Sequence, residues 1–157
     1  MHTGFALRTS HLPPDAARKT ALFQLLEQVC MSLELTETQQ AKAKEAYEAV
    51  GAWLIGSEAQ SLKLAEVYAH GSIALRTTVK PIASNEHDVD SMCLLRGVTP
   101  DTPPAVVKGL VGQRLREHGR YRTMLEEKTR CWRLNYANEF HLDLTPSIRN
   151  PHCPNGG

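Results

Sequence analysis

The sequence predicts a single α+β unit in which helices flank a mixed or antiparallel sheet. Its 157 residues are 41% hydrophobic, which is enough to bury one ordinary core and too little for two independent domains. Apolar residues recur at helical spacing near the N-terminus, whereas they alternate with polar residues in short segments further along. This order of elements is typical of the α+β class.

Four helices are predicted from their start signals and apolar spacing. The first begins at Pro13-Pro14-Asp15, because proline fits a first helical turn and aspartate suits its positive end. Its apolar stripe consists of Ala21, Leu22, Leu25, Leu26 and Val29. The second helix opens after Thr36 and spans about 39–54, with an expected stripe of Ala41, Ala46, Ala49, Val50 and Trp53. The other two are expected at 103–118 and 121–128.

Four strands are predicted, two in the middle of the chain and two near its end. Residues 65–70 form a strand that Gly71 ends, and residues 87–95 form the clearest strand of the chain. Residues 130–136 and 139–144 are expected to pair antiparallel, because the turn-prone pair Ala137-Asn138 lies between them.

The overall charge and the cysteines narrow the function classes. With 18 basic and 17 acidic side chains the net charge is +1, so bulk electrostatics demand neither a nucleic-acid nor a membrane partner. No stretch approaches the ~20 apolar residues that cross a bilayer, and no signal peptide is visible, so we expect a cytoplasmic protein. The scattered cysteines lack zinc spacing and predict neither a disulfide framework nor a zinc ribbon: Cys30, Cys93, Cys131 and Cys153.

The first chemical feature is Gly71-Ser72, which follows a predicted strand and precedes a short segment that can be helical. Backbone N–H groups at such a helix start can hold a phosphate, and glycine lets the chain approach it closely. The same pair is common in ordinary turns, so alone it leaves both interpretations open.

The second feature is Asp88-Val89-Asp90 within the predicted strand 87–95. Residues two apart in a strand share a face, so the two carboxylates project side by side while Val89 enters the core. Adjacent carboxylates repel unless a cation lies between them, and Mg²⁺ favours such carboxylates together with phosphate oxygens. The alternative interpretation is a solvated strand face or a turn.

The third feature is the alternating segment Phe140-His141-Leu142-Asp143-Leu144. An antiparallel neighbour would bring Asp143 beside Asp88 and Asp90. A third carboxylate at that place can bind a metal ion and accept the proton of an attacking hydroxyl. An ordinary strand aspartate is the alternative interpretation.

In this order the three features resemble the DNA polymerase beta superfamily of nucleotidyltransferases. The closest resemblance is to the bacterial cyclic-oligonucleotide synthases (CD-NTases), relatives of cyclic GMP-AMP synthase that act in antiphage signalling. Residues 71–81 are similar to that family's Gly-Ser-x-x-x-Gly-Thr-x-Val-Arg-Pro, and Asn85-Glu86-His87-Asp88-Val89-Asp90 follows. Residues 141–146 are similar to the family's His-hydrophobic-Asp-hydrophobic-x-Pro. The resemblance covers residues 68–146, about half of the chain.

The resemblance implies an enzyme that uses two Mg²⁺ or Mn²⁺ ions to move a nucleotide from an NTP to a hydroxyl, with release of pyrophosphate. Gly71 and Ser72 would hold the triphosphate, and Asp88 and Asp90 would bind the metal ions. Asp143 would complete one metal site and help deprotonate the hydroxyl. The resemblance also implies a downstream effector that senses the product and, in some cases, accessory regulators; nucleic acid is not expected as a substrate.

Two departures from the family pattern stand out. Arg76 occupies the position where the family usually has glycine, which indicates a different backbone path or an extra cation near the triphosphate. The family fold also continues with a helical C-terminal domain, which we expect to be missing here. The expected organisation is therefore N-terminal helices packing on the core at 1–60, a catalytic core at 61–148 and a flexible tail at 149–157.

Three functions stay open at this point. A second-messenger synthase that joins NTPs into a cyclic or linear oligonucleotide is supported by the motif continuation Thr77-Thr78-Val79-Lys80-Pro81. A minimal transferase that adds AMP to a protein or nucleotides to a tRNA end is favoured if the 157 residues are the natural product. A non-catalytic nucleotide-binding module is disfavoured, because such a module has no need of three mutually repelling acids.

Overall fold

The computed structural model describes residues 14–80 and 86–150 of the chain. The chain divides into two compact units, residues 1–34 and residues 35–157. Four parts of the sequence interpretation lie outside the described residues, namely Pro13, Pro81, Asn85 and the tail from Pro151. No helix in the described ranges combines the length and the apolar character needed to cross a membrane.

The first unit contains helix α1 (Pro14–Leu33), with Asp15 in its first turn as predicted. Its apolar side chains recur at the expected spacing, but they remain exposed. Leu22 is 56% exposed, Leu25 57% and Val29 45%. The periodicity therefore predicts the helix correctly, although within this unit the stripe enters no core.

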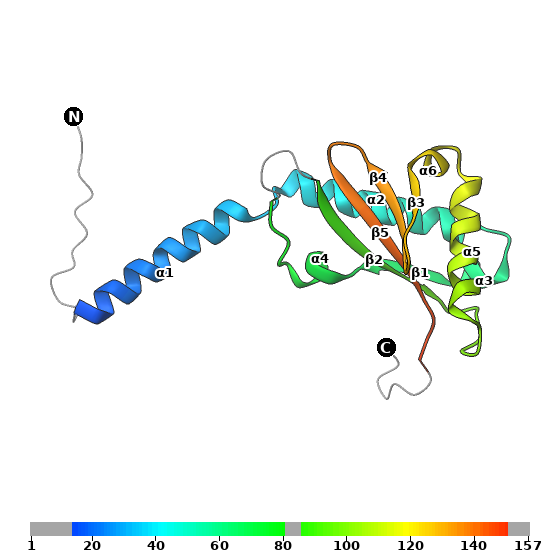
Figure 1. Cartoon of the computed structure of the whole chain (residues 1–157), viewed down its shortest axis with the longest axis horizontal. Coiled ribbons are helices and arrows are strands. Elements are labelled where there is room, and N and C mark those ends of the chain that lie inside the picture. The colour runs from blue at the N-terminus through cyan, green and yellow to red at the C-terminus, as the bar shows by residue number, and fades with distance from the viewer. Residues whose placement is uncertain (1–13, 81–85, 151–157) are drawn as a thin grey trace. The chain divides into compact units, whose positions relative to one another are not determined.

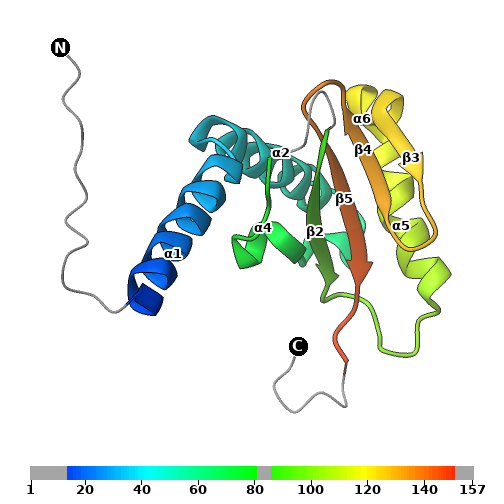
Figure 2. The same cartoon turned by 60° about the vertical axis from the view of Figure 1, so that its left-hand side comes forward.

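The second unit is built on a five-stranded sheet with the order β1-β2-β5-β4-β3. Figure 2 shows β5 between β2 and β4 at its centre. Strands β2 and β5 run parallel, and the other three pairs run antiparallel. The predicted mixed α+β architecture is thus confirmed. The strands are β1 (Ala65–Ala69), β2 (His87–Leu95), β3 (Leu125–Glu127), β4 (Trp132–Tyr136) and β5 (Phe140–Ser147).

The prediction of a helix over 121–128 was half wrong. Helix α6 (Gly119–Met124) ends early, and the chain continues directly into strand β3. Leu125 pairs with Leu134 of β4, and Glu127 pairs with Trp132. Ladder bonds to β4 therefore override a helix-forming local sequence, which propensity alone does not reveal.

Helix α2 (Glu37–Ile55) covers one face of the sheet, as Figure 1 shows. Thr36 caps it through a capping box with Gln39. The predicted stripe was partly wrong, because Ala41 and Ala49 are exposed. The alanines made this stripe ambiguous, since alanine is compatible with either face of a helix. The residues that α2 does bury are Ala43, Ala46, Val50, Gly51 and Leu54.

Helix α5 (Pro104–Glu117) adds to the same core and starts at the predicted proline. It buries Val107, Val111 and Leu115. Gly112 lets the helix pack directly against Trp132 of β4, because a Cβ there would lie 2.1 Å from Cζ2 of that side chain. Two short helices, α3 (Gln60–Lys63) and α4 (Gly71–Leu75), flank β1 in the chain.

A reciprocal contact joins α2 to α5. The indole Nε1 of Trp53 donates to the carbonyl of Arg114 at 2.9 Å, and the guanidinium of Arg114 donates back to the carbonyl of Trp53. The same guanidinium lies 3.7 Å from the centre of the indole ring. Helix α2 thus packs on the sheet, and the second unit begins at Leu35.

Candidate functional site

The charged residues of β2 and β5 lie on the sheet face opposite the core. In β2, His87, Val89 and Ser91 are buried, whereas Asp88 and Asp90 between them are not. In β5, Leu142 and Leu144 are buried while His141 and Asp143 face outward from them. Strict alternation in both strands therefore assigns all acidic side chains to one face.

The pairing of β2 with β5 brings the three predicted aspartates together. Asp90 lies opposite Asp143, and Asp88 lies opposite His141. We had expected an antiparallel pair, but β2 and β5 run parallel. The reason is the long connection between them, which passes through α5 and α6, whereas the hairpin from β4 supplies the antiparallel neighbour on the other side of β5.

The electrostatics of Asp90 reflect this crowding. Burial, and then the charges of Asp143 and Asp88, raise the pKa of the Asp90 carboxyl above its ordinary value. Within the described residues Asp90 has no ion pair, and Asp88 is 58% exposed at its side chain. The cluster therefore carries unbalanced negative charge at Asp90.

Arg133 on β4 is the site residue that the sequence analysis missed. Its Nε donates to Asp143 Oδ1 at 2.6 Å, and its Nη2 donates to Asp143 Oδ2 at 2.7 Å. The same Nη2 reaches Asp88 Oδ1 at 3.1 Å. The bonds to Asp143 raise the pKa of the guanidinium above its already high value, so Arg133 stays charged.

Arg133 pairs with Asp143 only in the hairpin register that the structure adopts. The sequence predicts the turn at Ala137-Asn138, but the structure forms a three-residue turn in which Asn138 has a φ of 63°. Tyr136 then pairs with Phe140, and Arg133 pairs with Asp143. With a two-residue turn, the partner of Arg133 would be Leu142, so the contact depends on a single residue of turn length.

His141 lies opposite Asp88 on the open face of the sheet. Its Nδ1 lies 3.3 Å from Asp88 Oδ1, and its Nε2 lies 2.5 Å from Glu86 Oε2. The other oxygen of Glu86 accepts from the backbone N–H of Asn138 at 2.6 Å. His141 is therefore held between two carboxylates, and the β4–β5 turn is tied to the residue that precedes β2.

Gly71 and Ser72 form the start of α4, next to Asp90. The N–H of His70 donates to the carbonyl of Asp90 at 2.8 Å. Gly71 has a φ of +57°, and a Cβ there would lie 2.4 Å from Asp90 Oδ2. A glycine is therefore required both by the backbone and by the carboxylate. Ser72 follows, and its Oγ accepts a hydrogen bond from Thr78 Oγ1 at 2.9 Å.

Arg76 ends α4 in a left-handed conformation, with φ 55° and ψ 38°. This geometry explains why glycine is the usual residue at this place in the family pattern, because only glycine adopts it without steric cost. Arg76 adopts this conformation at the cost of local strain. A different backbone path and an extra cation near the triphosphate both stay predictions.

The donor set suits a hard divalent cation, although the side chains are not gathered around one. Three carboxylates on one face offer the oxygen ligands that Mg²⁺ and Mn²⁺ prefer, and glycine at position 71 leaves room beside Asp90. In the part of the chain that the structure describes, no three His, Cys, Asp or Glu side chains form a ready metal site. Arg133 donates to both oxygens of Asp143.

Residues 21–156 match the family model of the Second Messenger Oligonucleotide or Dinucleotide Synthetase (SMODS) domain. The chain belongs to this family. The SMODS domain is similar to a c-di-GMP synthase of Roseivirga ehrenbergii, with 35% identity over 82% of this chain and 34% of that protein. It is also similar to the cyclic dinucleotide synthase CdnG of Bradyrhizobium diazoefficiens, with 30% identity over 87% of this chain and 32% of CdnG. This SMODS chain thus spans about a third of the length of these relatives.

Solved structures agree with this assignment. The CdnG of Bradyrhizobium diazoefficiens in complex with GTP superposes on this SMODS domain with a TM-score of 0.65 and 28% identity, covering 77% of this chain and 35% of that one. Cid1, described as an RNA terminal uridylyl transferase, superposes with a TM-score of 0.56 at 14% identity, covering 83% of this chain and 36% of Cid1. The second likeness concerns the fold alone, and together they confirm a polymerase beta-like nucleotidyltransferase fold.

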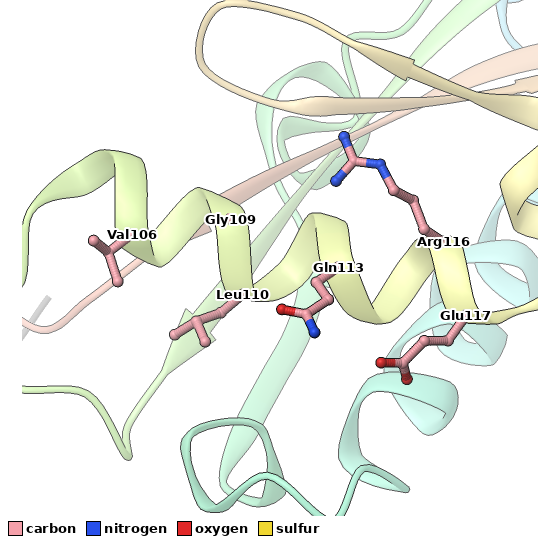
Figure 3. Close-up of a pocket in the computed structure, with 6 residues that line it drawn as sticks. All are labelled: Val106, Gly109, Leu110, Gln113, Arg116 and Glu117. Atoms are coloured by element: carbon pink, nitrogen blue, oxygen red, sulfur yellow. The ribbon is translucent and has the colours of Figure 1, made fainter.

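A groove on α5 lies apart from the predicted site residues. Figure 3 shows its lining along the helix, with Leu110 and Gln113 on one side and Arg116 turned away from them. It contains none of the residues predicted to bind nucleotide or metal. The predicted site residues lie instead on the open sheet face, where Asp90 pairs with Asp143 and Asp88 shares their side.

Proposed function

We propose that this chain is the catalytic core of a nucleotidyltransferase that joins NTPs into a cyclic or linear oligonucleotide second messenger. The observation that carries the proposal is the pairing of Asp90 with Asp143, with Asp88 on the same face and the start of α4 beside it. Membership in a family of oligonucleotide and dinucleotide synthetases supports it. A role in antiphage signalling, with an effector that senses the product, is the biological setting we propose.

Each of these residues has its own role in the proposed reaction. Gly71 and Ser72 bind the triphosphate of the donor NTP, and Asp143 accepts the proton of the acceptor hydroxyl. The hydroxyl oxygen then bonds to the α-phosphorus, the bond to the bridging oxygen breaks, and pyrophosphate leaves. Asp88, Asp90 and Asp143 would hold two Mg²⁺ or Mn²⁺ ions, which supply charge neutralisation for the phosphates and the attacking oxygen.

GTP is the first substrate to test. One relative is named a c-di-GMP synthase, and the solved CdnG was determined in complex with GTP. Both share at least 28% identity with this chain. A guanine-containing product is therefore our proposal, whereas a cytoplasmic location stays a prediction from the sequence.

The test is a search for the product. The chain, and any longer natural form of it, is incubated with the four NTPs, singly and together, and with Mg²⁺ or Mn²⁺. Mass spectrometry then identifies the small molecules, and a pyrophosphate assay follows turnover. We expect a guanine-containing oligonucleotide that requires the metal and disappears in Asp88→Asn and Asp90→Asn.

Other outcomes contradict the proposal in different ways. Label from the nucleotide on a protein or an RNA, without a free oligonucleotide, would identify a macromolecule-modifying transferase. Nucleotide binding without pyrophosphate release in the longest natural form would identify a non-catalytic module. An oligonucleotide that persists in both aspartate variants would remove these residues from the active site.

A further inference from the structure

Arg133 uses half of the oxygen atoms that the three aspartates present. The three carboxylates have six oxygens, and the guanidinium contacts three of them: both oxygens of Asp143 and Oδ1 of Asp88. These are charge-assisted bonds, and the pair with Asp143 has the two-pronged geometry that arginine favours. The carboxylate of Asp143 is therefore already paired with the guanidinium cation of Arg133.

The position of Arg133 is fixed by the core behind it. Its strand neighbours Trp132 and Leu134 are buried, and its own side chain is only 20% exposed. The side chain of Asp143 is 16% exposed. The ion pair therefore lies where solvent screens it weakly, in contrast to an ordinary pair at the protein surface.

A divalent cation needs the same oxygens. Metal coordination places a carboxylate oxygen about 2.0–2.1 Å from Mg²⁺ and draws electron density from that oxygen, which weakens a guanidinium N–H bond to it. Two positive charges that share one carboxylate also repel each other.

We propose that Arg133 is a positioning residue that holds Asp143 and Asp88 in the metal-free protein, and that a divalent cation displaces it from Asp143. The inference rests on the proposed function, because it takes the three aspartates to be the metal site. Arg133 thus stabilises the carboxylate cluster before the cation arrives and opposes weak, non-productive metal binding. Metal binding is accompanied by a movement of the guanidinium.

The first test measures Mn²⁺ affinity by electron paramagnetic resonance on the 157-residue chain without nucleotide. Arg133→Met keeps much of the side-chain length and removes the charge, so we expect Mn²⁺ to bind on the order of tenfold more tightly. Arg133→Lys keeps the charge and loses the two-pronged contact, so we expect a smaller gain. Arg122→Met, on the exposed side of α6, serves as the matched control and leaves the affinity unchanged.

The outcomes separate this inference from the proposed function. Mn²⁺ binding that survives unchanged in Asp88→Asn and Asp90→Asn would show that the metal site lies elsewhere, which contradicts the proposed function. Binding that requires these aspartates but is unchanged or weaker in Arg133→Met would overturn the role of Arg133 alone. Circular dichroism and thermal unfolding verify that each variant is folded.

A second measurement uses the unaltered chain, so it stands even if Arg133→Met fails to fold. The ¹⁵N resonance of the Arg133 Nε–H group, assigned by its absence in Arg133→Lys, is followed while Mg²⁺ is added. We expect the resonance to move toward that of a free arginine and its hydrogen exchange to accelerate. A resonance that stays in place while the Asp88 and Asp90 backbone signals shift would mean that Arg133 remains bound to Asp143, which overturns the inference.

Discussion

The two faces of the sheet are made by the same strands, yet different forces govern them. Toward α2 and α5, Val89, Leu134 and Leu142 are fully buried, and the hydrophobic effect holds them. On the opposite face, Asp88, Asp90 and Asp143 repel one another, and Arg133 balances only part of their charge. The buried face supplies the free energy of folding, so the open face can keep an arrangement that costs stability.

The separation of stability from chemistry is therefore the property that variants can test. Each charged residue of the site has buried neighbours before and after it in its strand. A substitution on one face should leave the other face nearly intact.

Asp90→Asn removes charge from the open face. We expect nucleotide transfer, measured as pyrophosphate release, to fall by roughly 10²–10³-fold or more. The folded protein should become more stable at neutral pH, because burial and neighbouring carboxylates raise the pKa of Asp90.

The pH dependence of unfolding sharpens this prediction. A carboxyl whose pKa is raised on folding binds its proton more tightly in the folded state. It therefore lowers the free energy of unfolding at pH values above its folded pKa, and this destabilisation disappears as the pH falls through that pKa. Urea titrations across this range should show the relief in the parent chain and not in Asp90→Asn. A variant less stable than the parent at neutral pH would contradict the account.

Leu142→Ala damages the buried face directly between two residues of the site. Leu142 is fully buried, so we expect the free energy of unfolding to fall by about 3 kcal/mol. The matched control is Val106→Ala, because Val106 is 49% exposed and should change stability by less than about 0.5 kcal/mol. Urea unfolding measures both, and equal effects in the two variants would show that the core is not where the structure places it.

Gly71→Ala disturbs the contact between the start of α4 and Asp90. The added Cβ would meet Asp90 Oδ2 at 2.4 Å, and the backbone has a positive φ. We expect a loss of about 1–2 kcal/mol in stability together with weaker nucleotide binding. Gly119→Ala is the control, since a Cβ there meets nothing within 4 Å. Thermal unfolding and fluorescent-nucleotide titration check both, and a Gly71→Ala variant that is as stable as the control and binds nucleotide as tightly would contradict the close packing of Gly71 against Asp90.

Arg76→Gly has the smallest expected effect and the opposite sign. Because Arg76 is left-handed at the end of α4, glycine should stabilise the protein by up to about 1 kcal/mol. The same chemical change at Arg122, inside helix α6, should destabilise it by about 0.5–1 kcal/mol. Denaturant midpoints compare the two variants, and a shift of the same direction in both would show that the strain at Arg76 is absent.

Local patterns in the sequence were sufficient to predict several strands, one helix start and the face on which each aspartate lies. Alternation in 87–95 and 140–144 predicted which aspartates share a face with each other and which neighbours enter the core. The strand ending at Gly71 and the start of α5 at Pro104 also followed from residue types alone. These features depend on the periodicity of the backbone, which neighbouring residues express without help from the rest of the chain.

Other features depend on contacts between distant segments. The parallel pairing of β2 with β5, the strand β3 and the meeting of Arg133 with Asp143 all required the folded chain. Each is a matter of register or direction, and a strand carries no local signal for either. A single residue of turn length at Asn138 determined which side chain Arg133 faces, because pairing partners change whenever the register shifts by one.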